Sequence, residues 1–135
     1  MVDSAKITSS NVAKQAFWNL YNLINNRTNI PNPNDTSGDT IFVYRRVPHF
    51  GREFAGFPFI VVSRTRPSKG KGVVDLTKVF RAYDFTVTVY SQDKSSDASA
   101  DPHAADQADL ITDSIIETLD SPTNRKTFID YGMAH

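Results

Sequence analysis

The stretch FRAYDFTVTVY, residues 80–90, carries the clearest secondary-structure pattern in this chain of 135 residues. Large apolar side chains alternate with small or polar ones, and the apolar set is Tyr83, Phe85, Val87 and Val89, together with Val79 just before the stretch. Successive side chains of a strand point to opposite faces of a sheet, so this alternation predicts a strand with one apolar and one largely polar face. Such a sheet needs a second layer of structure over its apolar face.

Two more strands are expected before this one. Residues 40–46 (TIFVYRR) and 59–65 (FIVVSRT) are rich in β-branched and aromatic side chains, and Pro58 is tolerated at the start of the second strand. Residues 73–79 could continue a hairpin, and residues 127–131 could form a short last strand. Because these segments follow one another closely, we expect hairpins and therefore a mainly antiparallel sheet of three to five strands.

Two amphipathic helices are expected to cover the sheet. The first spans about residues 9–27, where Ser9 or Ser10 can cap the free amides of the first turn. The second begins near Asp101-Pro102, since Asp is a good N-cap and the amide that Pro lacks would be unpaired there. The apolar stripes recur at spacings of three and four and consist of Ala13, Ala16, Phe17, Leu20, Leu23 and Ile24 in the first helix and Ala104, Ala108, Ile111, Ile115 and Leu119 in the second. We therefore predict an α+β fold with an N-terminal and a C-terminal helix packed on one face of the sheet.

Length and composition predict one domain over residues 1–135. Nine Phe, five Tyr and one Trp supply apolar surface for a core, and the absence of Cys excludes disulfides and thiolate chemistry. No apolar run has membrane-spanning length, and no signal peptide is expected at the N-terminus. Flexible segments are expected where turn-forming or small polar residues dominate, at about residues 1–8, 28–39, 66–72, 92–101 and 132–135.

The charges are segregated along the chain although the net charge is zero. Residues 45–81 contain nine Lys or Arg and two acids, whereas residues 84–120 contain nine acids and one Lys. A chain polarised in this way can bring opposite faces of identical copies together. The same pattern is also compatible with two ordinary solvated faces of a monomer.

Enzyme chemistry finds little support in the sequence. Lys69–Gly72 (KGKG) lacks the full phosphate-loop pattern and does not precede a convincing helix. Ser91, Asp101 and His103 contain the residue types of a catalytic triad, but no nucleophile elbow accompanies them. We therefore predict no catalytic residues and no enzymatic activity.

A metal site is not expected either. A divalent ion could use the oxygen and nitrogen ligands of Asp97, Asp101, His103 and Asp106. Acids at this place are explained as well by capping and by the helix dipole, which favours negative charge at a helix start. The sequence therefore predicts neither a metal site nor a cofactor.

Several side chains are candidates for contact with another subunit. The loop before the second strand contains Phe50 and Phe54, which would either fold back over the sheet or fill a hollow on a neighbour. Trp18 and Tyr21 lie beside the apolar stripe of the first helix and would flank the core or meet another subunit. The candidate interface residues are Phe50, Arg52, Glu53, Phe54, Asp109, Asp113 and Glu117.

The order of elements resembles that of the tail-terminator (tail-completion or head–tail joining) proteins of long-tailed bacteriophages. The resemblance covers nearly the whole chain. It rests on a helix at residues 11–26, VYRRVP at 43–48, FPFIVVSRT at 57–65, RAYDFTVTVYSQD at 81–93 and AADQADLITDSIIETLDSP at 104–122. It is a pattern of elements without invariant chemistry. The chain departs from the family after Pro122, where members often carry a fuller strand or hairpin.

The resemblance implies a structural role in the virion. Such proteins form a hexameric ring at the head-proximal end of the tail, end growth of the tail tube and join the tail to the neck. DNA passes through the lumen, and no catalysis or cofactor is involved. The implied partners are identical copies, the tail tube protein, a head-side neck protein and, transiently, the passing DNA; assembly takes place in the host cytoplasm. The basic tip could then face the lumen or the tail tube, and its residues are Arg64, Arg66, Lys69 and Lys71.

Other classes stay open at this point. The chain could be another neck or tail component, such as the head-side stopper or a tail tube subunit. It could also be a small cytoplasmic α+β ligand-binding protein, which would need a pocket with convergent polar groups. A nonspecific nucleic-acid binder would use the basic tip to contact phosphates, with a steep dependence on salt.

Overall fold

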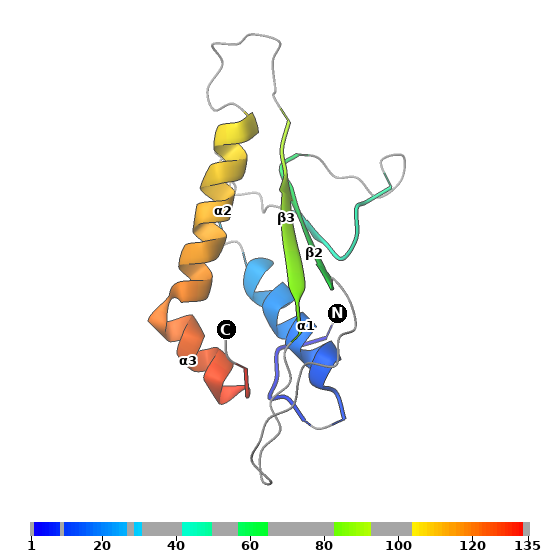
Figure 1. Ribbon diagram of the computed structural model, residues 1–135, viewed down its shortest axis with the longest axis vertical. Coiled ribbons are helices and arrows are strands. Elements are labelled where there is room, and N and C mark those ends of the chain that lie inside the picture. Colours follow the sequence, from blue (N-terminus) through cyan, green and yellow to red (C-terminus); the bar gives the residue numbers. More distant parts are fainter. Residues whose placement is uncertain are drawn as a thin grey trace.

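A computed structural model describes residues 2–8, 10–26, 29–30, 42–49, 57–64, 83–92 and 104–133 of this protein. Within these ranges the chain forms three helices and one mixed sheet of three strands, which confirms the α+β class (Figure 1). Among these helices, none is both long enough and apolar enough to cross a membrane.

The sheet consists of β1 (Phe42–Tyr44), β2 (Phe59–Arg64) and β3 (Phe85–Tyr90), in the order β1-β2-β3. β2 and β3 are antiparallel, as expected, but β1 runs parallel to β2. The expected hairpin between the first two strands is therefore wrong. Fourteen residues separate β1 from β2, and a connection of a dozen residues or more is long enough to return the chain for parallel pairing. The possible strand at residues 73–79 lies outside the described residues.

The two faces of the sheet bury different groups. Ile60 pairs with Val43 on one side and with Val89 on the other, so all three side chains share one face. This face packs against the helices. The opposite face buries Phe59, which stacks on Tyr90 with a ring-centroid distance of 4.7 Å. Both faces of β2 are therefore inside, which explains its unbroken apolar run.

The first helix, α1 (Val12–Ile24), begins later than its serines indicated. Asn11 is at the N-cap position, but its side chain makes no bond to the helix amides; it accepts the Thr8 amide at 2.9 Å instead. The buried side of α1 contains the expected Phe17 and Leu20, and it also buries two amides, Gln15 and Asn19. The apolar pattern alone did not predict these polar members of the buried face.

The second helix, α2 (Ala104–Asp120), is followed directly by α3 (Pro122–Asp130). The short strand expected at residues 127–131 is therefore wrong. Pro122 ends α2 as expected, but it also begins α3, because the first turn of a helix does not need its missing amide. Gly132, with a φ of 87°, ends α3: its amide donates to the Ile129 carbonyl, and the next amide, of Met133, donates to the Phe128 carbonyl at 2.7 Å.

One apolar core joins both long helices to the sheet. Phe17, Leu20 and Ile24 of α1 meet Ile60 and Val62 of β2 in this core. Its remaining buried members are Ile30, Ile111 and Ile115, and Trp18, Tyr21, Val43, Phe85, Val87, Val89 and Leu119 pack around them.

The N-terminal arm, residues 2–8, forms hydrogen bonds with α1 and with the end of α3. Asn19 holds it by exchanging two hydrogen bonds with the Ala5 backbone, at 3.0 and 2.9 Å. The Ile7 amide donates to the Tyr131 carbonyl at 2.8 Å, which ties the arm to the end of α3. Buried amide side chains on α1 thus fix the arm along the helix.

Candidate functional site

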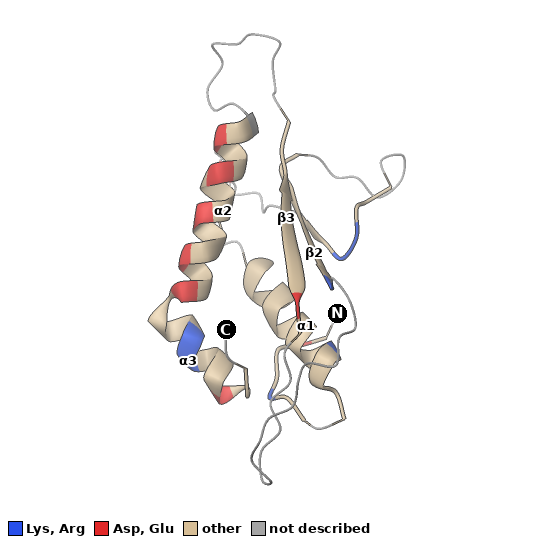
Figure 2. Ribbon diagram, viewed as in Figure 1, with Lys and Arg blue, Asp and Glu red and all other residues tan. Residues whose placement is uncertain are grey.

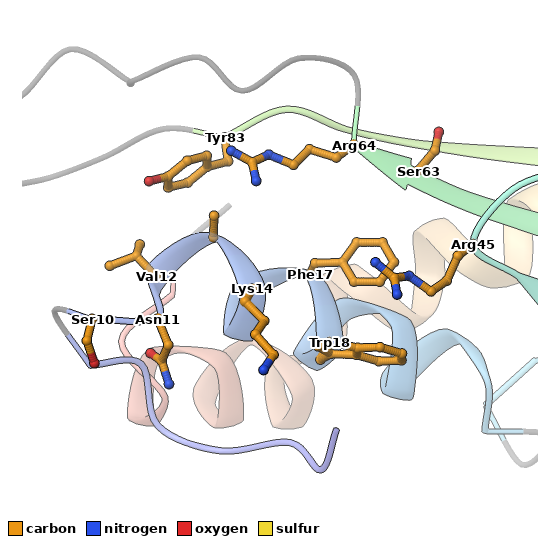
Figure 3. A pocket seen from close by; sticks show the side chains of 11 residues that line it. Ser10, Asn11, Val12, Lys14, Phe17, Trp18, Arg45, Ser63, Arg64 and Tyr83 are labelled. Atoms are coloured by element: carbon orange, nitrogen blue, oxygen red, sulfur yellow. The ribbon is translucent and has the colours of Figure 1, made fainter. Parts of the chain in front are cut away.

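An open cleft lies between the first turns of α1 and the ends of the strands (Figure 3). Its volume is about 530 Å³, within the usual range for ligand pockets. We call it the cationic cleft, and its cations and aromatic rings are Lys14, Phe17, Trp18, Arg45, Arg64 and Tyr83. Its described lining comes from four segments that are separate in the sequence.

Aromatic rings hold the two arginines of the cleft. The guanidinium of Arg45, directly after β1, lies 5.0 Å from the ring centroids of both Phe17 and Trp18. The guanidinium of Arg64, the last residue of β2, lies 5.2 Å from the ring centroid of Tyr83. Such cation–π contacts orient a guanidinium and leave N–H groups at its edge for other acceptors.

The cleft is electropositive. Lys14, Arg45 and Arg64 line it and are exposed, and no Asp or Glu belongs to the part of its lining that the structure describes. The first turn of α1 carries no acidic residue, so the positive end of the helix dipole adds to the field. Within the described ranges none of the three cations forms an ion pair. The arrangement favours binding of an anion.

Tyr21 connects α1 to β1 next to this cleft. Its hydroxyl donates a hydrogen bond to the Val43 carbonyl at 2.9 Å. Burial raises the pKa of Tyr21 above the usual tyrosine value, the positive charge of Arg45 opposes this shift, and Tyr44 adds to it. The neutral phenol is therefore the form that the folded state favours.

Replacing Tyr21 with Phe is expected to lower the free energy of unfolding by about 1 kcal/mol near neutral pH, since one part-buried hydrogen bond is lost. Because the pKa of Tyr21 is higher in the folded state, the unfolded state loses its proton first as pH rises past about 10. Stability should then fall above that pH, and less steeply in Tyr21→Phe. Urea denaturation between pH 7 and 11 measures both effects; parallel pH profiles would contradict the assignment.

The outer side of α2 forms a second charged surface, which we call the acidic face. Acidic residues recur along the whole helix (Figure 2), and they are Asp106, Asp109, Asp113, Glu117 and Asp120. The helical period places them opposite Ile111 and Ile115, which are buried in the core. Leu110 and Ile116 flank the row and are each 53% exposed, which is unusual for large apolar side chains.

The cationic cleft and the acidic face lie on different sides of the molecule. α1 begins at the cleft, on the side away from α2 (Figure 1). At the other end of α1, Ile24 shares the core with Ile111 and Ile115 of α2. The 13 residues of α1 correspond to a length of roughly 20 Å at the usual rise per residue.

The structure places only some of the expected site residues. Asp109, Asp113 and Glu117 are exposed together on the acidic face, and Arg64 lies in the cationic cleft. The other candidates lie outside the described residues; these are Phe50, Arg52, Glu53, Phe54, Arg66, Lys69 and Lys71.

Most residues of the possible metal site and of the possible catalytic triad also lie outside the described residues. Of the four possible metal ligands only Asp106 is described, and of the possible triad only Ser91 is. The described part of the chain contains no group of three or more acidic or histidine side chains that could hold a metal.

Sequence reasoning assigned no binding site to Lys14, Arg45 or Tyr83, and it expected Trp18 to flank the core or to meet another subunit. The basic pair that follows the first strand, Arg45-Arg46, was the available signal for Arg45. Comparisons with protein-family models, with curated proteins and with solved structures found no match to this chain.

Proposed function

We propose that this protein is a structural subunit of a bacteriophage tail, which forms a ring at the head-proximal end, ends growth of the tail tube and joins the tail to the neck. The observation that carries the proposal is the separation of the cationic cleft from the acidic face of α2. The ring itself is inferred from the order of elements in the sequence, which resembles that of tail-terminator proteins. The two charged surfaces could provide the contact between neighbouring subunits.

A closed ring requires contacts in which one surface of a subunit meets a different surface of the next. Two complementary surfaces on different sides of one chain meet this requirement. Pairing of two acidic faces, or of two cationic clefts, would place like charges together and is disfavoured. Charge therefore disfavours a two-fold dimer in which either surface pairs with itself, and the placement of the two surfaces on different sides of the chain favours head-to-tail contacts.

Exposed apolar side chains flank the acidic face, and another lies two residues after Arg45 of the cationic cleft. Leu110 and Ile116 flank the acidic face, and Val47, which is 49% exposed, follows the basic pair Arg45-Arg46. Interfaces between proteins combine a less polar centre with a charged rim. Charge would orient the two subunits, and burial of these apolar side chains between copies would stabilise the contact.

Parts of the proposal extend beyond the described residues. The possible fourth strand at residues 73–79, the aromatic loop contact of Phe50 and Phe54, and Arg66, Lys69 and Lys71 of the basic tip all belong there. In this proposal the ring needs no cofactor and performs no catalysis. The DNA that passes through its lumen makes only transient, nonspecific contacts.

Mass measurement and electron microscopy of the purified protein test the ring directly. A hexamer has six times the 15.1 kDa mass of the chain and should appear as short annular particles. Added to a polymerising tail tube protein, it should cap the tubes and stop their growth. A monomer at every concentration, with no effect on tube growth, contradicts the proposal. Long tubes formed by this protein alone indicate a tail tube subunit instead.

Reversing charge on the acidic face is expected to impair assembly. In Asp109→Lys/Asp113→Lys the subunit concentration at half assembly should rise by about tenfold or more, because attraction becomes repulsion. Sedimentation velocity over a dilution series measures this shift. The control Asp3→Lys/Asp130→Lys makes the same change in net charge at exposed sites outside α2 and should assemble normally. Equal weakening in both variants would show that net charge, rather than this face, controls assembly.

A further inference from the structure

We propose that the cationic cleft of one copy binds carboxylates from the acidic face of α2 of the next copy. The inference rests on the proposed ring, since it names the contact through which the ring would close. It assigns Arg45 and Arg64 to the subunit interface. This differs from the contact with the lumen or the tail tube that the sequence resemblance implied for Arg64.

The chemistry of the two surfaces is matched. Guanidinium groups bind carboxylates through paired N–H···O bonds, which are among the stronger hydrogen bonds in proteins. Ring contacts already orient Arg45 over Phe17 and Trp18 and Arg64 over Tyr83. Less side-chain freedom is therefore lost when a carboxylate binds.

The spacing of the acids suits a cleft of this kind. Asp109, Asp113 and Glu117 follow one another at intervals of four residues, so their side chains are neighbours about 5–6 Å apart on one side of the helix. The cleft is open and about 530 Å³ in volume, which admits side chains from one helical turn rather than a whole helix. More than one carboxylate can thus reach the two arginines and Lys14.

A second copy accounts for these features better than a nucleic acid does. The complementary surface is present in the same chain, whose net charge is zero. A phosphate backbone is usually met by a basic stripe on a domain with a pI above about 9, whereas the pI here is about 6.8. The described lining of the cleft holds three cations gathered around aromatic rings rather than a long stripe.

Two complementary variants test this contact. The cleft variant is Arg45→Glu/Arg64→Glu, and the helix variant is Asp109→Lys/Asp113→Lys. Each alone is expected to assemble about tenfold or more weakly, because like charges then face each other at every contact. An equimolar mixture should recover assembly, since each variant keeps one native surface and offers one reversed surface to the other. A ring that alternates in this way needs an even number of subunits, which six satisfies.

The matched control for the cleft variant is Arg125→Glu/Lys126→Glu. It reverses two exposed cations on α3 and changes net charge by the same amount. It should assemble like the native chain. Arg45→Gln/Arg64→Gln removes the charge with a smaller change in side-chain chemistry, and circular dichroism checks that all variants are folded. Recovery in the mixture also shows that both partners are folded.

Trp18 gives a local readout, because it is the one tryptophan of the chain and lines the cleft. The helix variant keeps Trp18 and a native cleft, and it is titrated with a cleft variant that also carries Trp18→Phe. A saturable change in emission that weakens as salt is added is expected. Association without any change in Trp18 emission would place the contact elsewhere and overturn the inference.

The outcomes separate this contact from the proposed function. Normal rings from the cleft variant overturn the contact and leave the ring proposal standing. Recovery by the mixture, with native protein that forms only open chains or leaves tube growth unaffected, supports the contact and contradicts the terminator role. Cleft-dependent binding of duplex DNA by a native protein that stays monomeric overturns the contact in favour of a polyanion site.

Discussion

Replacing Phe59 with Ala is expected to lower the free energy of unfolding by about 3–5 kcal/mol, the usual cost of deleting a buried aromatic side chain. Phe59 has no exposed surface, and among the described residues three aromatic rings lie next to it. Its ring centroid is 4.7 Å from Tyr90, 5.3 Å from Phe57 and 5.7 Å from Tyr44. Because a domain of this size has a total stability of roughly 5–15 kcal/mol, the loss should be visible as partial unfolding at physiological temperature.

Urea denaturation monitored by circular dichroism measures this change, and two variants calibrate it. Phe59→Leu keeps most of the buried volume and is expected to cost less than about 1.5 kcal/mol. Ile129→Ala truncates a side chain that is 64% exposed, so its effect should stay within about 0.5 kcal/mol. If Phe59→Ala cost no more than Ile129→Ala, the face of the sheet opposite the helices would not be a packed layer.

Local sequence patterns were sufficient to predict the long helices α1 and α2 and the antiparallel strands β2 and β3. The alternation in β3 is real: Phe85, Val87 and Val89 pack toward the core shared with the helices. β2 has no such alternation because both of its faces are buried, with Ile60 on one and Phe59 on the other. The periodicity of apolar residues indicates which side chains are buried. In these helices and strands the buried side chains follow a helical period, a strict alternation or a continuous run, so the sequence was sufficient.

Local sequence patterns could not predict the parallel pairing of β1 with β2. They also could not predict that residues 122–130 form the helix α3. Periodicity does not report the direction of a partner strand, and the long connection after Tyr44 permits parallel as well as antiparallel pairing. Residues 127–131 contain a short aromatic and branched run that is compatible with a strand. The helical start at Pro122 and the left-handed Gly132 decide for a helix instead.

Only one of the two charged surfaces can be predicted from the sequence alone. The acidic face of α2 is visible because one helix carries all its members at regular spacing. The cationic cleft is not, because Lys14, Arg45, Arg64 and Tyr83 meet only after the sheet and α1 have packed. In a contact between these surfaces, the cationic cleft would depend on the tertiary fold, whereas the acidic face would depend only on the helix α2.

Replacing Asn19 with Ala is expected to lower the free energy of unfolding by about 2–4 kcal/mol, because buried polar groups lose their partners. Asn19 is 1% exposed, and its side-chain oxygen accepts the Ala5 amide at 3.0 Å and the Gln15 side-chain amide at 2.8 Å. Its nitrogen donates to the Ala5 carbonyl at 2.9 Å. Alanine can replace none of these bonds.

The same substitution should release the N-terminal arm, so hydrogen exchange at the Ala5 amide should approach that of an unfolded chain. Asn22→Ala is the matched control: Asn22 also donates to the arm, at the Val2 carbonyl and the Ser4 hydroxyl. Because Asn22 is only half-buried, water can replace these bonds and the expected cost is about 0.5–1.5 kcal/mol. Equal costs for the two variants, or an Ala5 amide that stays protected in Asn19→Ala, would mean that contacts such as the Ile7–Tyr131 hydrogen bond hold the arm without the buried amide.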